Sequence, residues 1–244
     1  MLNTYKTLLT KKTQLNASTY LYHFDLLEPK EIVFKAGQYL MLKVPSDKGP
    51  VSRLYSIASP DFEKNSFDLI IEMVPGGLAS NYLLSLKENS QVVFQGPAGV
   101  FGLKENDRPK IFMVTGTGIA PIRSILNSKF KIQNSKLFLF WGLKTYQDVY
   151  LLEELKNYEL RITNFKFKIC LSREQNLNMI PEVDKKFFEI DHVNTYFNKL
   201  FPNPYSLIPN YDYYLCGGRD IVESLRLFLI NKGILQENIY FEKF

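Results

Sequence analysis

The sequence predicts two domains, an antiparallel β-barrel over residues 1–105 followed by a parallel-sheet α/β domain over residues 106–244. A chain of 244 residues is long for one domain and sufficient for two. The first part contains short runs of β-branched and aromatic residues separated by turn residues, which is typical of an all-β domain. The second part alternates buried-strand runs with helical patterns, which indicates a parallel sheet. The pattern changes in the polar segment LKENDR, Leu103–Arg108.

Five short runs in the first part predict strands. Their close spacing favours an antiparallel sheet or a small barrel. The predicted strands are Thr19–Leu26, Tyr39–Val44, Arg53–Ala58, Phe67–Met73 and Gln91–Gln95. A helix is expected to start near Gly77.

The second part predicts five strands and four helices, with the helices covering both faces of a parallel sheet. The strands are Lys110–Thr115, Lys136–Trp141, Phe165–Leu171, Tyr211–Cys216 and Asn238–Phe241. The helices begin at Pro121, span Gln147–Asn157, lie around residues 191–200 and span Asp220–Asn231. In the last helix, Asp220 and Glu223 have the spacing of a capping box. Its expected apolar face is Ile221, Leu225, Phe228 and Leu229. The proline-containing segment 176–210 is expected to be irregular apart from its helix.

Composition restricts the class of protein. An apolar fraction of 45% and a charged fraction of 23% are those of an ordinary globular protein. No run approaches the roughly 20 apolar residues that span a bilayer, and the opening MLNTYKTLLTKKTQ has no signal-peptide pattern, so we expect a cytoplasmic location. Two cysteines cannot supply the about four thiolates of an iron–sulfur cluster, and with two histidines no metal site is expected. The lysines are scattered and no nucleic-acid-binding motif is present, so a nucleic-acid-binding protein is not expected.

The net charge of +5 falls in the second part of the chain. Residues 1–107 carry 11 basic and 11 acidic residues, which leaves 19 basic and 14 acidic residues for 108–244. This excess suits a phosphate-rich ligand or an acidic protein partner, and it is equally compatible with a solvated surface.

A glycine-rich turn, Thr115-Gly116-Thr117-Gly118-Ile119-Ala120-Pro121, lies between a predicted strand and a predicted helix. Glycines allow a tight turn and close approach to a ligand, and proline is well tolerated in the first helical turn. The free N–H groups of that helix start favour a diphosphate. The turn lacks the last glycine of the G-x-G-x-x-G fingerprint, so by itself it could be a plain strand-to-helix connection.

Further motifs follow a recognisable order along the chain. They are Arg53-Leu54-Tyr55-Ser56, Gly76-Gly77-Leu78-Ala79-Ser80, Gly96-Pro97-Ala98-Gly99-Val100-Phe101, Cys216-Gly217-Gly218 and Glu242-Lys243-Phe244. With the glycine-rich turn, they make the chain resemble the ferredoxin–NADP reductase superfamily, in particular stand-alone reductases and the FAD/NAD modules of oxygenase reductases. The resemblance covers essentially the whole chain. It implies an FAD-binding barrel, a nucleotide-binding sheet domain and a flavin held at the cleft between them.

The resemblance assigns FAD-binding roles to two of these motifs. Arg53 would bind the FAD diphosphate, and Leu54 lies in the same motif. Tyr55 would pack against the isoalloxazine, and Ser56 would lie at flavin N5, the atom that receives hydride. Gly77, Leu78, Ala79 and Ser80 would offer backbone N–H groups and a hydroxyl to the FAD phosphates. Each assignment has an alternative. Arg53 could form a surface ion pair, Tyr55 could be a core residue, and the motif ending in Ser80 could be a hairpin loop with a helix cap.

The remaining motifs would bind the nicotinamide dinucleotide. Thr115, Gly116, Thr117, Gly118 and Pro121 would hold its diphosphate, and Cys216, Gly217 and Gly218 would lie near the nicotinamide. Glu242 and Phe244 would lie near the flavin, with Phe244 covering the ring until nicotinamide displaces it. Alternatively, Cys216 is only a buried apolar residue, and the tail that contains Glu242 and Phe244 is frayed. The resemblance thus gives Ser56, Cys216 and Glu242 as the catalytic residues, with Cys216 helping to orient the nicotinamide rather than acting as a nucleophile.

The choice between NADPH and NADH depends on the end of the third strand of the second part. Ser172 and Arg173 follow that strand, and an arginine there can pair with a 2′-phosphate, which favours NADPH. NADH remains an alternative co-substrate, because the further lysine and tyrosine that bind the 2′-phosphate in plant-type enzymes are not evident. In addition, Lys144 stands where an arginine is common in the family.

The function implied is that of a flavoprotein reductase that moves hydride from NAD(P)H to FAD and electrons to a one-electron carrier. Ferredoxin, flavodoxin or an oxygenase component would be that carrier, as a separate protein, because the chain lacks cluster-binding cysteines. An NAD(P)H-dependent flavin, quinone or metal reductase is an alternative, which candidate acceptors would distinguish. A non-catalytic adaptor subunit with the same fold is another, and it would be colourless.

Overall fold

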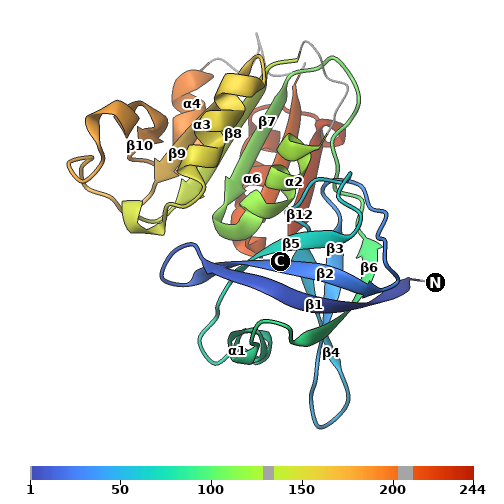
Figure 1. Ribbon diagram of the computed structural model, residues 1–244. Helices are drawn as coiled ribbons and strands as arrows, with labels where there is room; N and C mark the ends of the chain where they lie inside the picture. The colour runs from blue at the N-terminus through green and yellow to red at the C-terminus, as the bar shows by residue number, and fades with distance from the viewer. Residues whose placement is uncertain (1, 129–134, 203–210) are drawn as a thin grey trace. The chain divides into compact units, whose positions relative to one another are not determined.

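The computed structural model describes residues 2–128, 135–202 and 211–244. The chain forms two compact units (Figure 1). One comprises the described residues of Met1–Leu103 and Ala120–Phe130, and the other those of Lys104–Ile119 and Lys131–Phe244. Because this division follows contacts rather than chain order, the predicted domain bounds, 1–105 and 106–244, stay a prediction.

The first unit is built on a six-stranded antiparallel sheet with the order β4-β3-β6-β1-β2-β5. Its strands are β1 (Asn3–Gln14), β2 (Thr19–Glu28), β3 (Tyr39–Val44), β4 (Val51–Ser56), β5 (Ser66–Glu72) and β6 (Gln91–Ala98). A bridge between Ile57 and Leu69 joins the extension of β4 to β5, so the two edges of the sheet meet. The antiparallel barrel class predicted from sequence is confirmed, with β1 as a strand that the sequence did not predict.

The barrel core is filled by aromatic and aliphatic side chains from alternate strand positions. Phe24, Phe67 and Phe94 pack together with ring centroids 5.0–5.5 Å apart, and all three are fully buried. The helix α1 (Leu78–Ser85) covers part of this core with Ala79 and Leu83. Burial of such rings dominates the stability of a small barrel.

The helix α2 (Ile119–Asn127) is joined to the strands of the first unit by polar contacts. The Arg123 guanidinium donates to the Asp68 carboxylate at 2.9 Å and to the Ala58 carbonyl at 3.0 Å. His23 contacts the same carboxylate at 2.6 Å, and this hydrogen bond raises the pKa of His23. The helix therefore braces the segment that directly follows β4.

The second unit is built on a six-stranded parallel sheet with the order β10-β9-β8-β7-β11-β12. Its strands are β7 (Lys110–Thr115), β8 (Leu137–Leu143), β9 (Phe165–Leu171), β10 (Phe188–Glu189), β11 (Asp212–Gly217) and β12 (Ile239–Lys243). The chain builds outward from β7 to β10 and then returns to the other side of β7 with β11. The direction of winding therefore reverses between β7 and β11, and in open α/β sheets such a reversal opens a ligand crevice at the carboxyl ends of the strands.

Helices cover both faces of this sheet. They are α3 (Leu152–Arg161), α4 (Val193–Leu200) and α6 (Arg219–Asn231). Phe197 of α4 and Leu225 of α6 share one core with Tyr213 of β11. On the opposite face, Tyr158 of α3 packs against the ring of Phe165. The parallel α/β class predicted from sequence is confirmed.

Three details of the second unit differ from the prediction. The predicted helix Gln147–Asn157 is instead a short 3-10 turn at Tyr146–Asp148, followed by α3 from Leu152. The predicted capping box of the last helix is wrong, because Gly218 is the N-cap and Glu223 pairs with Arg226 at 2.7 Å. In the same helix Ile221 is exposed and Val222 takes its place in the core. Of the segment expected to be irregular, residues 203–210 lie outside the described residues.

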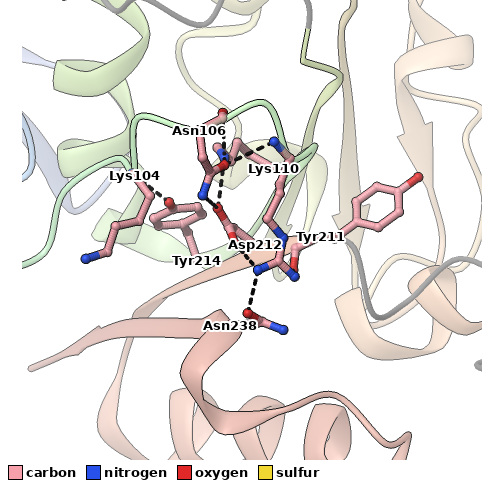
Figure 2. Close-up of polar contacts among 8 residues, drawn as sticks. Lys104, Asn106, Lys110, Tyr211, Asp212, Tyr214 and Asn238 are labelled. Atoms are coloured by element: carbon pink, nitrogen blue, oxygen red, sulfur yellow. Dashed lines mark hydrogen bonds and ion pairs between the residues drawn. The ribbon is translucent and has the colours of Figure 1, made fainter.

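A buried ion pair joins the amino ends of β7 and β11 (Figure 2). The Lys110 ammonium lies 2.8 Å from the Asp212 carboxylate, and both side chains are fully buried. Asn106 donates to the same carboxylate at 3.0 Å and accepts a bond from Lys110, and Arg108 lies 3.4 Å from it. The sheet is expected to bind ligands at the carboxyl ends of its strands. This cluster lies at the amino ends, away from that region.

Within the described parts of the chain, no helix combines the length and the apolar composition needed to cross a membrane.

Candidate cofactor-binding sites

The edge strand β4 carries a cation with no acidic partner. Arg53 is exposed and donates to the Ser52 carbonyl at 2.9 Å, and within residues 2–128, 135–202 and 211–244 it forms no ion pair. Tyr55, two residues further on the same face, packs partly against the barrel core, and this burial raises the pKa of its hydroxyl. The Ser56 hydroxyl is half-buried and makes no hydrogen bond to any other described residue. An unneutralised guanidinium beside a half-covered ring and an available hydroxyl suits a ligand with both phosphate and aromatic parts.

The first turn of α1 presents backbone N–H groups without a side-chain cap. Gly77 is the N-cap residue and no side chain bonds to the helix start. The N–H groups of Leu78, Ala79 and Ser80 occupy the first helical positions, where an intrahelical partner is lacking. Ser80 itself accepts a hydrogen bond from the Val74 N–H at 2.9 Å, so its hydroxyl also braces the preceding loop. Leu54 and Leu78 are both exposed.

These features fit the pyrophosphate and ring of FAD. A methyl group at Gly77 would lie 3.0 Å from the Val74 carbonyl and 3.3 Å from the Ser80 hydroxyl, so a larger residue would press on the loop before the helix. The preceding Gly76 has φ +72°, which favours glycine as well. An open helix start attracts negative charge. Arg53 and the amides of the first turn of α1 are therefore the groups that would hold the phosphates.

The glycine-rich turn at the end of β7 packs against the end of β11, at the reversal point of the second sheet. A methyl group added to Gly118 would lie 2.3 Å from the Cys216 carbonyl oxygen, and one added to Gly217 would lie 2.3 Å from the Thr115 hydroxyl. Gly116 and Gly217 also have φ values of +52° and +150°. The two motifs, distant in sequence, thus pack closely against each other to form one cradle, and this packing requires glycine at both positions. Such a cradle fits a dinucleotide phosphate.

Two aromatic side chains that the sequence did not assign to the site hold this turn. The Trp141 indole N–H donates to the Gly116 carbonyl at 2.9 Å, and the Tyr150 hydroxyl donates to the same oxygen at 3.2 Å. The two rings pack edge to face with centroids 4.8 Å apart. The available sequence signal was the single tryptophan at the end of the second predicted strand of this part.

Cys216 is fully buried, and burial raises the pKa of its thiol well above the ordinary value. A thiol that stays protonated at neutral pH is a poor nucleophile, which agrees with an expected role in orientation only. Glu242 is the direct neighbour of Cys216 in the β11–β12 ladder. Phe244 is bonded through its backbone to Gly217 at 3.2 Å and to the Arg219 N–H at 3.1 Å, with an exposed ring. These residues therefore gather at the carboxyl end of β11.

Of the other predicted residues, Ser172 and Arg173 lie at the carboxyl end of β9. The Ser172 hydroxyl donates to the Leu143 carbonyl at 3.2 Å, and the Arg173 N–H donates to the Lys144 carbonyl at 2.8 Å. The side chains of Lys144 and Arg173 are exposed and form no ion pair in the part of the chain that the structure describes. Thr117 lies in the glycine-rich turn, and Pro121 lies in α2, which its contacts assign to the first unit.

Comparison with known proteins identifies the family. The oxidoreductase FAD-binding domain matches residues 6–102 and the oxidoreductase NAD-binding domain matches residues 112–226. The electron transfer component of toluate 1,2-dioxygenase from Pseudomonas putida is 30% identical over 98% of this chain, which spans 67% of that relative's length. The chain thus covers about two thirds of this curated relative.

Solved structures share the fold. The cytochrome P450 reductase GcoB from Amycolatopsis aligns with a TM-score of 0.85 at 24% identity, over 100% of this chain and 70% of that one. A ferredoxin NADP+ reductase from Neisseria gonorrhoeae, solved with bound FAD and NADP, aligns with a TM-score of 0.79 at 19% identity, over 99% and 98% of the two chains. With its FAD-binding and NAD-binding domains in this order, the chain belongs to the ferredoxin–NADP reductase superfamily of FAD-dependent NAD(P)H oxidoreductases.

Proposed function

We propose that the protein is a flavoprotein reductase that takes hydride from NAD(P)H onto FAD and passes electrons to a one-electron carrier. The observations that support this most are the uncapped start of α1, whose first turn has no acidic residue, and the glycine-dependent close packing of the ends of β7 and β11. Bound FAD would supply the chemistry, because it accepts two electrons together and releases them singly. The residues of the chain supply binding, orientation and hydrogen bonds.

Each proposed residue has a role that its position supports. Arg53 would neutralise the FAD diphosphate, and the Ser56 hydroxyl, which has no partner in the described part of the protein, would bond the ring at N5. Gly118 and Gly217 would keep the turn and the end of β11 closely packed, so that the backbone of both motifs could bind the nicotinamide dinucleotide. Cys216 would help to orient the nicotinamide, with Glu242 and Phe244 alongside. Correct placement of the two rings would be the main contribution of the protein to the rate.

We further propose that NADPH is preferred over NADH. Lys144 follows β8 and Arg173 follows the adjacent strand β9, and both carry exposed cations. A hydrogen bond from the Arg173 N–H to the Lys144 carbonyl joins their backbones. The nearby Glu174 carboxylate is engaged by the Tyr146 N–H at 2.9 Å, so it is held in the loop. Two exposed cations at the ends of the adjacent strands β8 and β9 suit a 2′-phosphate, whereas NADH has only a hydroxyl there.

The test is stopped-flow bleaching of the flavin absorption band with NADPH and NADH side by side. A yellow protein that bleaches faster with NADPH supports both proposals, and Arg173→Ala should remove the difference. Equal rates with both nucleotides would contradict the role of Arg173. A colourless protein that FAD cannot reconstitute would contradict the enzymatic function and favour an adaptor.

The electron acceptor is proposed to be a ferredoxin, a flavodoxin or an oxygenase component. The relative named above is the electron transfer component of a dioxygenase, and residues 108–244 carry the net positive charge of the chain. Docking of an acidic carrier to a basic surface is electrostatic, so the rate of carrier reduction should fall steeply with added salt. Reduction of quinones or free flavin at a rate independent of salt, with no carrier reduction, would contradict this proposal.

A further inference from the structure

The helix α1 lacks charged residues of its own at both ends. Its first turn has no acidic residue, its last turn has no basic residue, and no side chain caps its start. A helix carries partial positive charge at its N-terminus and partial negative charge at its C-terminus. It also leaves the first N–H groups and the last carbonyls without intrahelical partners. The Ser85 hydroxyl donates to the Tyr82 carbonyl at 2.7 Å, but any charge that compensates either end of α1 must come from elsewhere.

The strand β1 supplies the cation for the C-terminal end. The Lys12 ammonium donates to the Leu84 carbonyl at 3.1 Å and to the Leu83 carbonyl at 3.4 Å, 72 and 71 residues away in sequence. It also lies over the rings of Tyr20 and Tyr22, 5.4 and 5.7 Å from their centroids. Aromatic faces and carbonyl oxygens together stabilise a partly desolvated cation. The partial burial of this ammonium lowers its pKa.

The position of Lys12 has a consequence for the opposite end of the helix. With eight residues, α1 has little more than two turns, and helices this short are marginal without tertiary support. Ala79 and Leu83 attach it to the barrel core through apolar contacts. These contacts hold the helix in place but do not bond its last carbonyls.

We propose that Lys12 is a positioning residue for FAD, which fixes the last turn of α1 so that the amides of the first turn stay aimed at the FAD diphosphate. The inference rests on the proposed FAD-binding role of α1. In this arrangement the helix is held between two external charges, the ammonium of Lys12 at one end and the bound phosphates at the other. Loss of the ammonium frays the last turn and loosens the grip on the phosphates.

The experiment compares the rate of FAD release from holoprotein variants, followed by the rise of free flavin fluorescence after dilution. Lys12→Met should release FAD about tenfold faster, because the helix loses its cation and two hydrogen bonds. Lys12→Arg should restore slow release, since a guanidinium can donate to both carbonyls. The matched control is Lys11→Met, on the same strand, where the side chain is exposed and forms no hydrogen bond or ion pair with other described residues.

Rescue by arginine separates a positioning role from general loss of structure, and thermal unfolding of each holoprotein is measured in parallel. Equal FAD release from Lys12→Met and wild type, or equally fast release from Lys12→Arg and Lys12→Met, would overturn the inference. If Lys12→Met does not fold, Lys12→Gln replaces it, and release as slow as in the wild type would have the same meaning. Failure of the wild type to bind FAD would instead overturn the proposed function, which keeps the two outcomes distinct.

Discussion

The buried pair Lys110–Asp212 should be far more sensitive to the loss of one partner than to the loss of both. Both side chains are inaccessible to water and 2.8 Å apart. Removing one partner from a buried pair leaves a charge that water cannot reach, at a cost of about 3–5 kcal/mol. For a chain of this size each kcal/mol lowers the melting temperature by roughly 2–4 °C. Lys110→Met should therefore lower it by about 6–20 °C.

The surroundings of the pair predict an asymmetry. In Lys110→Met the carboxylate keeps Asn106 at 3.0 Å and Arg108 at 3.4 Å, so its cost should lie at the lower end of the range. In Asp212→Leu the buried ammonium keeps the hydrogen bonds to Asn106 and only the weaker attraction of the Asp107 carboxylate, so its cost should lie at the upper end. The double variant should be more stable than Asp212→Leu, because neither buried charge remains.

The assay is a double-mutant cycle by thermal and urea unfolding of the holoprotein. An exposed pair of similar separation, Lys6 and Glu28 at 2.7 Å, is the control, and Lys6→Met should leave stability unchanged because exposed pairs are screened by water. Flavin bleaching by NAD(P)H should be normal at temperatures where the variants are folded, since the pair lies at the amino ends of the strands. Additive costs in the double variant would refute the reasoning.

Three further predictions concern the sites and the buried thiols. Gly118→Ala should raise KM for NAD(P)H by at least about tenfold, or roughly 1.4 kcal/mol, at unchanged FAD content, because its methyl group would press on the Cys216 carbonyl; an unchanged KM would contradict the cradle. Ser56→Ala should slow flavin reduction by about tenfold in stopped-flow experiments and change FAD release much less; equal reduction rates would mean that Ser56 is misassigned. Burial raises the pKa of Cys170 from 9.0 to about 12, so above pH 9 the unfolded chain loses a proton that the folded chain keeps, and the free energy of unfolding falls towards pH 12. Urea titrations from pH 8 to about pH 11 should show a shallower fall for Cys170→Ala, and identical slopes would argue against the raised thiol pKa.

The sequence predicted strands best where the apolar pattern was continuous. The runs Tyr39–Val44 and Phe165–Leu171 coincide with β3 and β9. The strand β1 was missed because one of its inward positions is Thr7, whose hydroxyl is satisfied only by the distant Val92 carbonyl at 3.0 Å. A pattern of hydrophobic residues cannot show a polar side chain that is buried through a partner on another strand.

Tertiary contacts also explain why the helix after β8 starts late. Leu151 has φ +57°, which interrupts a helix, and Tyr150 is drawn out of the helix to contact Trp141 and the Gly116 carbonyl. The glycines of the candidate site were visible in sequence because a backbone that needs glycine tolerates little else. The contacts that Trp141 and Tyr150 make with the Gly116 carbonyl could not be predicted, because these partners are far apart in sequence and are brought together only by folding.

The fluorescence of Trp141 should report on the glycine-rich turn. It is the single tryptophan of the chain, it is shielded from solvent, and its ring nitrogen is bonded to the turn that would receive the dinucleotide. Tryptophan emission, excited selectively beyond the absorption of the 15 tyrosines, therefore originates from one indole, which is bonded to the glycine-rich turn. A shift in that emission on adding NADP+ would follow nucleotide binding directly, without a label and without turnover.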